Sequence, residues 1–179
     1  MKLVKFGGSS VASAERIKHI IDLILLTDRT RKYAVFSTFG KKDSNDIKIT
    51  DQLEQIAAQF YNTGEYPKER VEKIRNKYYT ETQALGLDTN FLDKQFEELE
   101  RIIKNKLEPF DRYYSAIVAQ GERLFVSIPA EYLKSRGLNA VAVYPEKCGL
   151  ITDSNYRNAT VLPGALANVK KYITAIKAD

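Results

Sequence analysis

The chain has 179 residues, of which 44% are apolar and 11% aromatic, and its formal net charge is +5. This composition supports a sizeable core and excludes a wholly disordered protein. No apolar run reaches the ~20 residues of a membrane span, so we expect no membrane segment. The basic residues are spread along the chain and match no nucleic-acid-binding signature, so we expect no nucleic-acid partner. We expect no signal peptide, and the single cysteine, Cys148, excludes an internal disulfide and fits a reducing cytoplasm.

The first 38 residues predict a strand, a glycine-rich turn, a helix and a second strand. Residues 2–6 have strand character, and Ser13 is a suitable N-cap for a helix over about 14–27. A short apolar run at 32–38 predicts the second strand. This order requires a crossover connection, so we expect the two strands to be parallel and the fold to belong to the α/β class.

The middle of the chain predicts helices without strands. One helix opens at Asp51, a second covers about 68–84, and Asn90 is expected to cap a third. Glycines and prolines separate the three segments. We therefore expect a helical insertion at about 51–110 between elements of the sheet.

The last third predicts a return to alternating elements. Residues 114–124 are ambiguous between strand and helix, and the helix that follows is expected to end at Gly137. Residues 139–144 predict a strand, and Pro163 is expected to open a last helix. Because a parallel sheet normally continues with a strand after a helix, we expect the sequence to be truncated at this point.

The turn after the first strand is suited to a phosphoryl group. Gly7 and Gly8 allow the backbone to approach a ligand closely, Ser9 adds a hydroxyl donor, and the following helix contributes partial positive charge. Lys5 brings a full charge near the strand's carboxyl end, where open α/β sheets bind ligands. A tight structural turn beside a solvated lysine is the alternative reading. The spacing is neither that of a P-loop nor that of a dinucleotide fingerprint.

Four segments resemble the aspartate kinases of the amino acid kinase family, in the same order. They are VKFGGSSVA at 4–12, VFSTFGKKDSNDIKITDQL at 35–53, GERL at 121–124 and GLITDSNYRNATVLP at 149–163. The resemblance implies a three-layer αβα sandwich about a mainly parallel sheet. It also implies transfer of the γ-phosphate of MgATP to the side-chain carboxylate of L-aspartate, the first step toward lysine, threonine and methionine. No protein-held metal is expected.

The resemblance also implies a role for each matching residue. Lys5 matches the catalytic lysine that meets the phosphates, and Gly7, Gly8 and Ser9 match the turn that holds the phosphoryl group. Three residues match positions that contact the amino-acid substrate: Ser37, Thr50 and Glu122. The glutamate is implied to hold the α-ammonium group, and a charge-assisted bond of this kind is about twice as strong as a neutral one.

The chain departs from the family pattern at Thr38, Phe39 and Phe125, where smaller residues or proline are expected. It also lacks the downstream glycine-rich segment that would supply an arginine for the α-carboxylate. We therefore expect residues 1–179 to be the N-terminal part of a catalytic domain, without the nucleotide-binding half and the regulatory domains. The full-length enzyme is expected to be a homo-oligomer.

Two alternatives remain open at this stage. Another member of the family would phosphorylate glutamate, acetylglutamate or UMP, and a binding-only half domain would turn over nothing. Near the candidate site, Arg123 reads as structural rather than as a ligand. Asp153 could serve a pocket rim or end a strand in a turn.

Overall fold

The first two strands form a parallel pair, as the sequence predicts. The structure is a computed structural model and describes residues 2–178. Strand β1 (Leu3–Phe6) pairs in parallel with β2 (Tyr33–Phe36), with Phe6 opposite Phe36. These two strands make up the sheet within the described residues. Their carboxyl ends therefore lie at the same edge, close to the glycine-rich turn.

The connection between the strands begins with the 3₁₀ turn η1 (Gly8–Val11) and continues in helix α1 (Ala14–Ile20). Ser13 caps α1 as predicted, because its hydroxyl accepts a hydrogen bond from the Arg16 amide at 3.4 Å. The expected single helix over 14–27 changes to a π turn, η2 (Ile21–Leu25), for its last part. The change of hydrogen-bond pattern ends the helix before the chain returns to β2.

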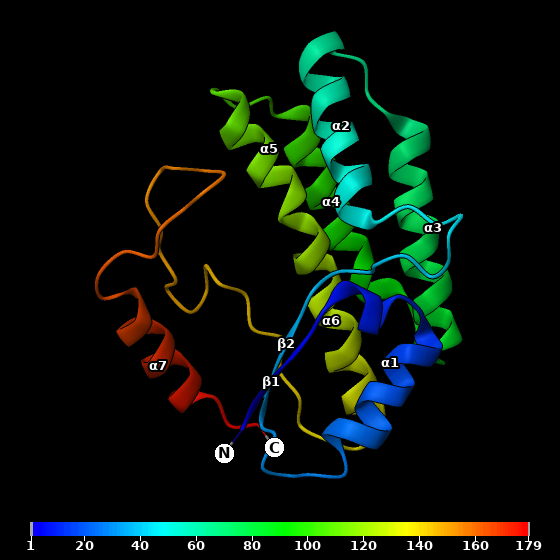
Figure 1. Cartoon of the computed structure of the whole chain (residues 1–179), viewed down its shortest axis with the longest axis vertical. Coiled ribbons are helices and arrows are strands. Elements are labelled where there is room, and N and C mark those ends of the chain that lie inside the picture. The colour runs from blue at the N-terminus through cyan, green and yellow to red at the C-terminus, as the bar shows by residue number, and fades with distance from the viewer. Residues whose placement is uncertain (1, 179) are drawn as a thin grey trace.

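Three helices fill the expected insertion within the described structure. They are α2 (Ile49–Thr63), α3 (Lys68–Ala84) and α4 (Asn90–Lys104). The predicted cap of the third is displaced by one residue, because Thr89 occupies the N-cap position and Asn90 is the first helical residue. In Figure 1 this part of the molecule stands beyond the carboxyl ends of β1 and β2.

The ambiguous segment at 114–124 is helical. Helix α5 (Phe110–Val118) leads directly into α6 (Gln120–Ser135), which runs behind the two strands in Figure 1 and contacts β2. Gly137 follows α6 with φ 83°, the left-handed conformation that favours glycine at a helix end. The buried core draws its side chains from β1 through α6.

The predicted strand at 139–144 is wrong. These residues are irregular in the structure, and Val141 is 45% exposed. An apolar run becomes a strand only when a neighbouring strand supplies its hydrogen bonds, and no described segment lies beside this one as a ladder partner. An isolated antiparallel bridge between Thr152 and Val161 closes the next loop.

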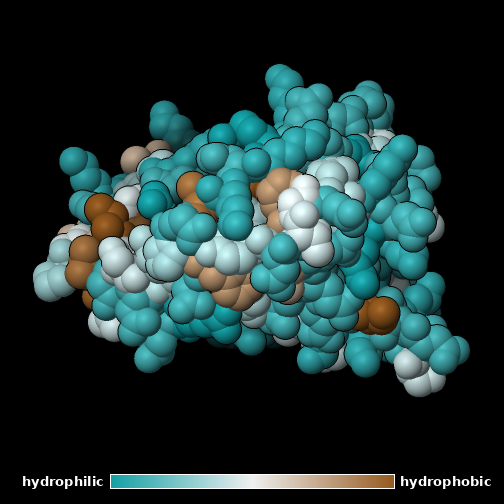
Figure 2. Space-filling view, turned by 90° about the horizontal axis from the view of Figure 1, so that it is seen from above, coloured by the Kyte–Doolittle hydropathy of each residue, from teal (hydrophilic) through white to brown (hydrophobic). Residues whose placement is uncertain are grey.

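Helix α7 (Ala165–Ala175) follows Gly164, so it begins two residues after the predicted Pro163. It lies away from the helices of the insertion in Figure 1, and Leu166 on its surface is 70% exposed. Figure 2 shows a mostly hydrophilic face whose apolar atoms gather mainly at the end that carries α7. Among residues 2–178, no helix combines the length and apolar character needed to cross a membrane.

Candidate active site

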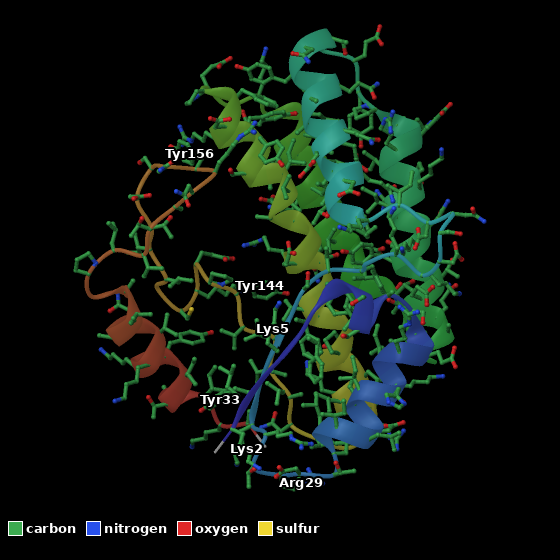
Figure 3. The ribbon with its side chains drawn as sticks, in the orientation of Figure 1. Lys2, Lys5, Arg29, Tyr33, Tyr144 and Tyr156 are labelled. Atoms are coloured by element: carbon green, nitrogen blue, oxygen red, sulfur yellow. The ribbon has the colours of Figure 1, made fainter. Side chains whose placement is uncertain are left out.

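The turns that follow β1 and β2 lie side by side. The Ser37 amide donates to the Phe6 carbonyl at 3.0 Å, which places Ser37 next to Gly7. Lys5, labelled in Figure 3, precedes Phe6 on β1, and its side chain is exposed. Among the described residues, Lys5 has no ion pair or side-chain hydrogen bond. A free ammonium group thus lies at the strand ends, where α/β sheets bind ligands.

Two glycines allow these turns to touch. The Gly40 amide donates to the Gly8 carbonyl at 3.0 Å. A Cβ atom added at Gly40 would lie 2.5 Å from the Gly8 carbonyl carbon, and one added at Gly8 would lie 3.1 Å from the Thr38 oxygen. The close backbone contact therefore requires glycine at Gly40, and it leaves only tight space for a side chain at Gly8.

Gly7 differs from these two glycines. Its φ of −79° is open to any residue, and a Cβ atom added there would meet nothing within 4 Å. The fold itself therefore does not require a glycine at this position. The space in front of the Gly7 backbone is available for a ligand.

Helix α6 brings Glu122 to the same edge of the sheet. The Ser37 hydroxyl lies 3.5 Å from Glu122 Oε1, across 85 positions of sequence. Glu122 is in the first turn of α6, and Thr50 is in the first turn of α2, where its hydroxyl lies 3.5 Å from Asp51 Oδ1. The two helices pack closely, since a Cβ atom at Gly121 would lie 3.2 Å from Leu53 Cδ1. The structure thus brings Ser37 and Glu122 together directly, while Thr50 lies at the start of a helix that packs on α6 and its hydroxyl contacts Asp51.

Helix α3 holds the loop between Gly40 and α2 through hydrogen bonds from Lys77. Lys77 Nζ donates to Asp46 at 2.5 Å and to the Gly40 carbonyl at 3.2 Å. Glu81 accepts the Ala14 amide at 2.6 Å, at the start of α1. A helix from the insertion therefore holds segments that flank the candidate site on two sides.

The ion pair between Lys77 and Asp46 gives a testable pH dependence. Burial opposes ionisation of Asp46, but hydrogen bonds from Lys77 and the Lys42 amide outweigh it, and the pKa of Asp46 is lowered. A lowered folded-state pKa contributes stability that is present at neutral pH and is lost as the pH falls through that pKa. We expect Asp46→Asn to reduce the free energy of unfolding by about 1 kcal/mol at pH 7.

This difference should shrink as the pH falls below about 4, the ordinary aspartate pKa, and through the lowered pKa of Asp46, because protonated aspartate is neutral like asparagine. Urea unfolding of both proteins across this range measures it. Asp43→Asn is the matched control, because Asp43 is in the same loop and accepts only a local amide hydrogen bond from Asn45. A constant difference at all pH values would show that the ion pair is not its source.

Two side chains whose roles the sequence left undecided, Arg123 and Asp153, have structural partners. Arg123 forms an ion pair with Glu146 at 2.5 Å, which agrees with the structural reading of this arginine. Asp153 Oδ1 accepts the amides of Asn155 and Thr160, both at 3.1 Å, so it shapes a turn. Among residues 2–178, no group of histidine, cysteine and acidic side chains is placed to hold a metal ion.

Sequence reasoning missed the contribution of α3. Tyr78 is completely buried, and its hydroxyl contacts both Thr38 and Gly121. Val71, Ile74 and Tyr78 are spaced three and four residues apart, so the sequence could have placed Tyr78 on a buried helix face. Its partners could not be read in this way, because they come from distant segments.

Comparisons with known proteins identify the family of the chain. Residues 1–176 match the sequence model of the amino acid kinase family. The chain is 32% identical to aspartokinase 3 of Bacillus subtilis over 94% of its length, and 30% identical to the chloroplastic aspartokinase 1 of Arabidopsis thaliana over 94%. It spans 37% and 30% of the lengths of these relatives, respectively.

Solved structures give the same result for the fold. The aspartate kinase of Clostridium acetobutylicum is 30% identical, with a TM-score of 0.63 over 74% of this chain and 29% of that protein. E. coli aspartokinase III, solved with aspartate and ADP, is 20% identical, with a TM-score of 0.75 over 97% of this chain and 37% of that protein. The expected α/β fold of these enzymes is thereby confirmed. The chain belongs to the amino acid kinase family.

Proposed function

We propose that the protein transfers the γ-phosphate of ATP to the side-chain carboxylate of L-aspartate, giving aspartyl-4-phosphate. The single observation that carries this proposal is the Ser37–Glu122 pair, 3.5 Å apart beside the glycine-rich turn. A carboxylate and a hydroxyl beside a phosphate-type turn suit an acceptor that carries an ammonium group. The aspartokinases among the relatives, and the complex of E. coli aspartokinase III with aspartate and ADP, support this choice of acceptor.

In this proposal Glu122 accepts hydrogen bonds from the substrate ammonium, and Ser37 and Thr50 orient the rest of the amino acid. The substrate carboxylate is ionised at neutral pH, so the attack requires no general base. Catalysis then depends on positioning and on neutralising the charge of the phosphoryl group as it moves.

Lys5 is proposed to supply that charge, while the amides of Gly7, Gly8 and Ser9 hold the phosphoryl oxygens. The exposed ammonium of Lys5, which pairs with no residue that the structure describes, and the open space at Gly7 support these roles. ATP enters as MgATP, so Mg²⁺ is part of the substrate and adds charge neutralisation of its own.

Residues 1–179 are proposed to be the acceptor-binding part of an amino acid kinase catalytic domain, with the helices from Ile49 to Lys104 as its insertion. The matches to about a third of the length of the relatives support this domain assignment. We propose a homo-oligomeric full-length enzyme in the cytoplasm. The single cysteine, Cys148, supports a reducing compartment.

The natural gene product that contains this chain tests the activity. It is incubated with MgATP, hydroxylamine and L-aspartate, L-glutamate or acetylglutamate, and acyl phosphates are trapped as hydroxamates; UMP phosphorylation is followed through ADP release. We expect turnover with L-aspartate. Turnover with another acceptor alone would replace this function by that of a relative, and no turnover with any acceptor would favour a binding-only half domain.

The variant Glu122→Gln tests the role of the carboxylate. We expect the KM for L-aspartate to rise roughly 10- to 100-fold, because a hydrogen bond to a charged group contributes about 1.5–3 kcal/mol. Glu131→Gln is the matched control, since Glu131 is on the same helix and pairs only with Lys134. An unchanged KM in Glu122→Gln would remove this residue from the acceptor site.

A further inference from the structure

Tyr78 joins the two segments that carry the proposed acceptor-binding pair. It lies on α3, its side chain is completely buried, and its hydroxyl donates to the Gly121 carbonyl at 2.8 Å. The same hydroxyl lies 2.6 Å from Thr38 Oγ1. Thr38 follows Ser37 directly, and Gly121 precedes Glu122 directly. Tyr78 therefore contacts the immediate neighbours of both residues of the pair.

The direction of these hydrogen bonds follows from the chemistry of the groups. A carbonyl can only accept a hydrogen bond, so the Tyr78 hydroxyl donates its single proton to the Gly121 carbonyl. The Thr38 hydroxyl must then donate to the tyrosine oxygen. Burial raises the pKa of Tyr78 well above its usual value, so the proton remains on this hydroxyl at physiological pH. The result is a directed chain from Thr38 through Tyr78 to Gly121.

The departures from the family pattern pack around this chain. The Phe39 ring lies edge-on to Tyr78, with centroids 5.0 Å apart, and edge-on to Phe125, with centroids 4.8 Å apart. Phe39 is 1% exposed and Phe125 is fully buried. Thr38, Phe39 and Phe125 thus form one contiguous cluster with Tyr78. The three departures from the family pattern are explained together by their packing around this tyrosine.

We propose that Tyr78 is a positioning residue for acceptor binding, which acts by fixing the separation between Ser37 and Glu122 through Thr38 and Gly121. This inference rests on the proposed function for its choice of substrate. Without the tyrosine hydroxyl, the Gly121 carbonyl and the Thr38 hydroxyl lose the group that links them, so the start of α6 and the segment after β2 can relax independently. Small displacements of binding groups have large effects on reaction rates and affinity.

Tyr78→Phe tests the proposal, and Tyr113→Phe is its matched control. Tyr113 is also completely buried, and its hydroxyl also donates to a main-chain carbonyl, that of Ile103, at 2.6 Å. Both variants delete one buried hydroxyl and keep the ring. We expect both to lower the urea midpoint by similar amounts. In the natural gene product, only Tyr78→Phe should raise the KM for L-aspartate, by about tenfold, with the KM for ATP unchanged.

A second readout needs no substrate. Amide NMR spectra of the 179-residue chain should show shifts at Ser37 and Glu122 in Tyr78→Phe that are absent in Tyr113→Phe. Thr38→Val, which removes the donor but keeps the shape, should move the same two amides. If aspartate turnover is absent in the wild type, the proposed function fails, and the amide shifts alone decide the positioning role. Equal shifts at these two amides in Tyr78→Phe and Tyr113→Phe would overturn the positioning role of Tyr78. The same KM for L-aspartate in both variants would also overturn it.

Discussion

Replacing Lys5 by alanine is expected to lower kcat for aspartate phosphorylation by roughly 10²- to 10³-fold, the loss that follows removal of one charge-stabilising donor. The KM for L-aspartate should change little, because the lysine acts on the moving phosphoryl group rather than on the bound amino acid. We expect no large loss of stability, because Lys5 is exposed and its side chain has no partner among the described residues.

Lys2→Ala is the control for this experiment. Lys2 precedes the same strand and pairs with Asp28 at the surface, so its removal should leave both kinetic constants unchanged. Steady-state kinetics of the natural gene product give both values. A large loss of aspartate affinity at unchanged kcat in Lys5→Ala would contradict the role assigned to this lysine.

Replacing Gly40 by alanine is expected to lower the thermal midpoint of unfolding by several degrees. The added Cβ would lie 2.5 Å from the Gly8 carbonyl carbon and 2.6 Å from its oxygen, and backbone atoms cannot move aside as a flexible side chain can. Overpacking of this kind costs about 1–3 kcal/mol, which is roughly 2–12 °C in a protein of this size.

Gly7→Ala is the matched control for Gly40→Ala, because it adds the same methyl group to the neighbouring turn in open space. Its thermal midpoint should be unchanged or slightly raised, since alanine restricts the unfolded chain. Its affinity for MgATP should fall, because the methyl group would occupy the space proposed for the phosphoryl group. Equal midpoints for Gly40→Ala and the wild type would contradict the described contact between the two turns.

The sequence was sufficient to predict the parallel pairing of the first two strands. A strand, a glycine-rich turn, a capped helix and a second strand allow few arrangements, and the observed parallel pairing of β1 with β2 is the expected one. The predicted strand at 139–144 was wrong because a strand depends on a neighbour that sequence periodicity does not reveal.

Within the candidate site, local patterns placed Lys5 and the glycines, and the resemblance pointed to Ser37, Thr50 and Glu122. The contact between Ser37 and Glu122 joins segments 85 positions apart, so only the folded chain shows it. The same holds for Tyr78, which looked like an ordinary helix residue. Its proposed role depends on hydrogen bonds with Thr38 and Gly121, which come from distant segments, and no local sequence pattern reveals these contacts.

The most direct test of the central claim is the thermal unfolding midpoint of this chain with L-aspartate, L-glutamate, acetylglutamate or UMP, each with and without MgATP. A ligand that binds only the folded state stabilises it by mass action, by about 2.7 kcal/mol when its concentration is 100 times its Kd, and the unfolding midpoint rises as a result. We expect a rise with L-aspartate that is lost in Glu122→Gln, which would show that the acceptor site around Ser37 and Glu122 is formed by these residues. A rise with another acceptor alone, or one that Glu122→Gln leaves intact, would contradict it.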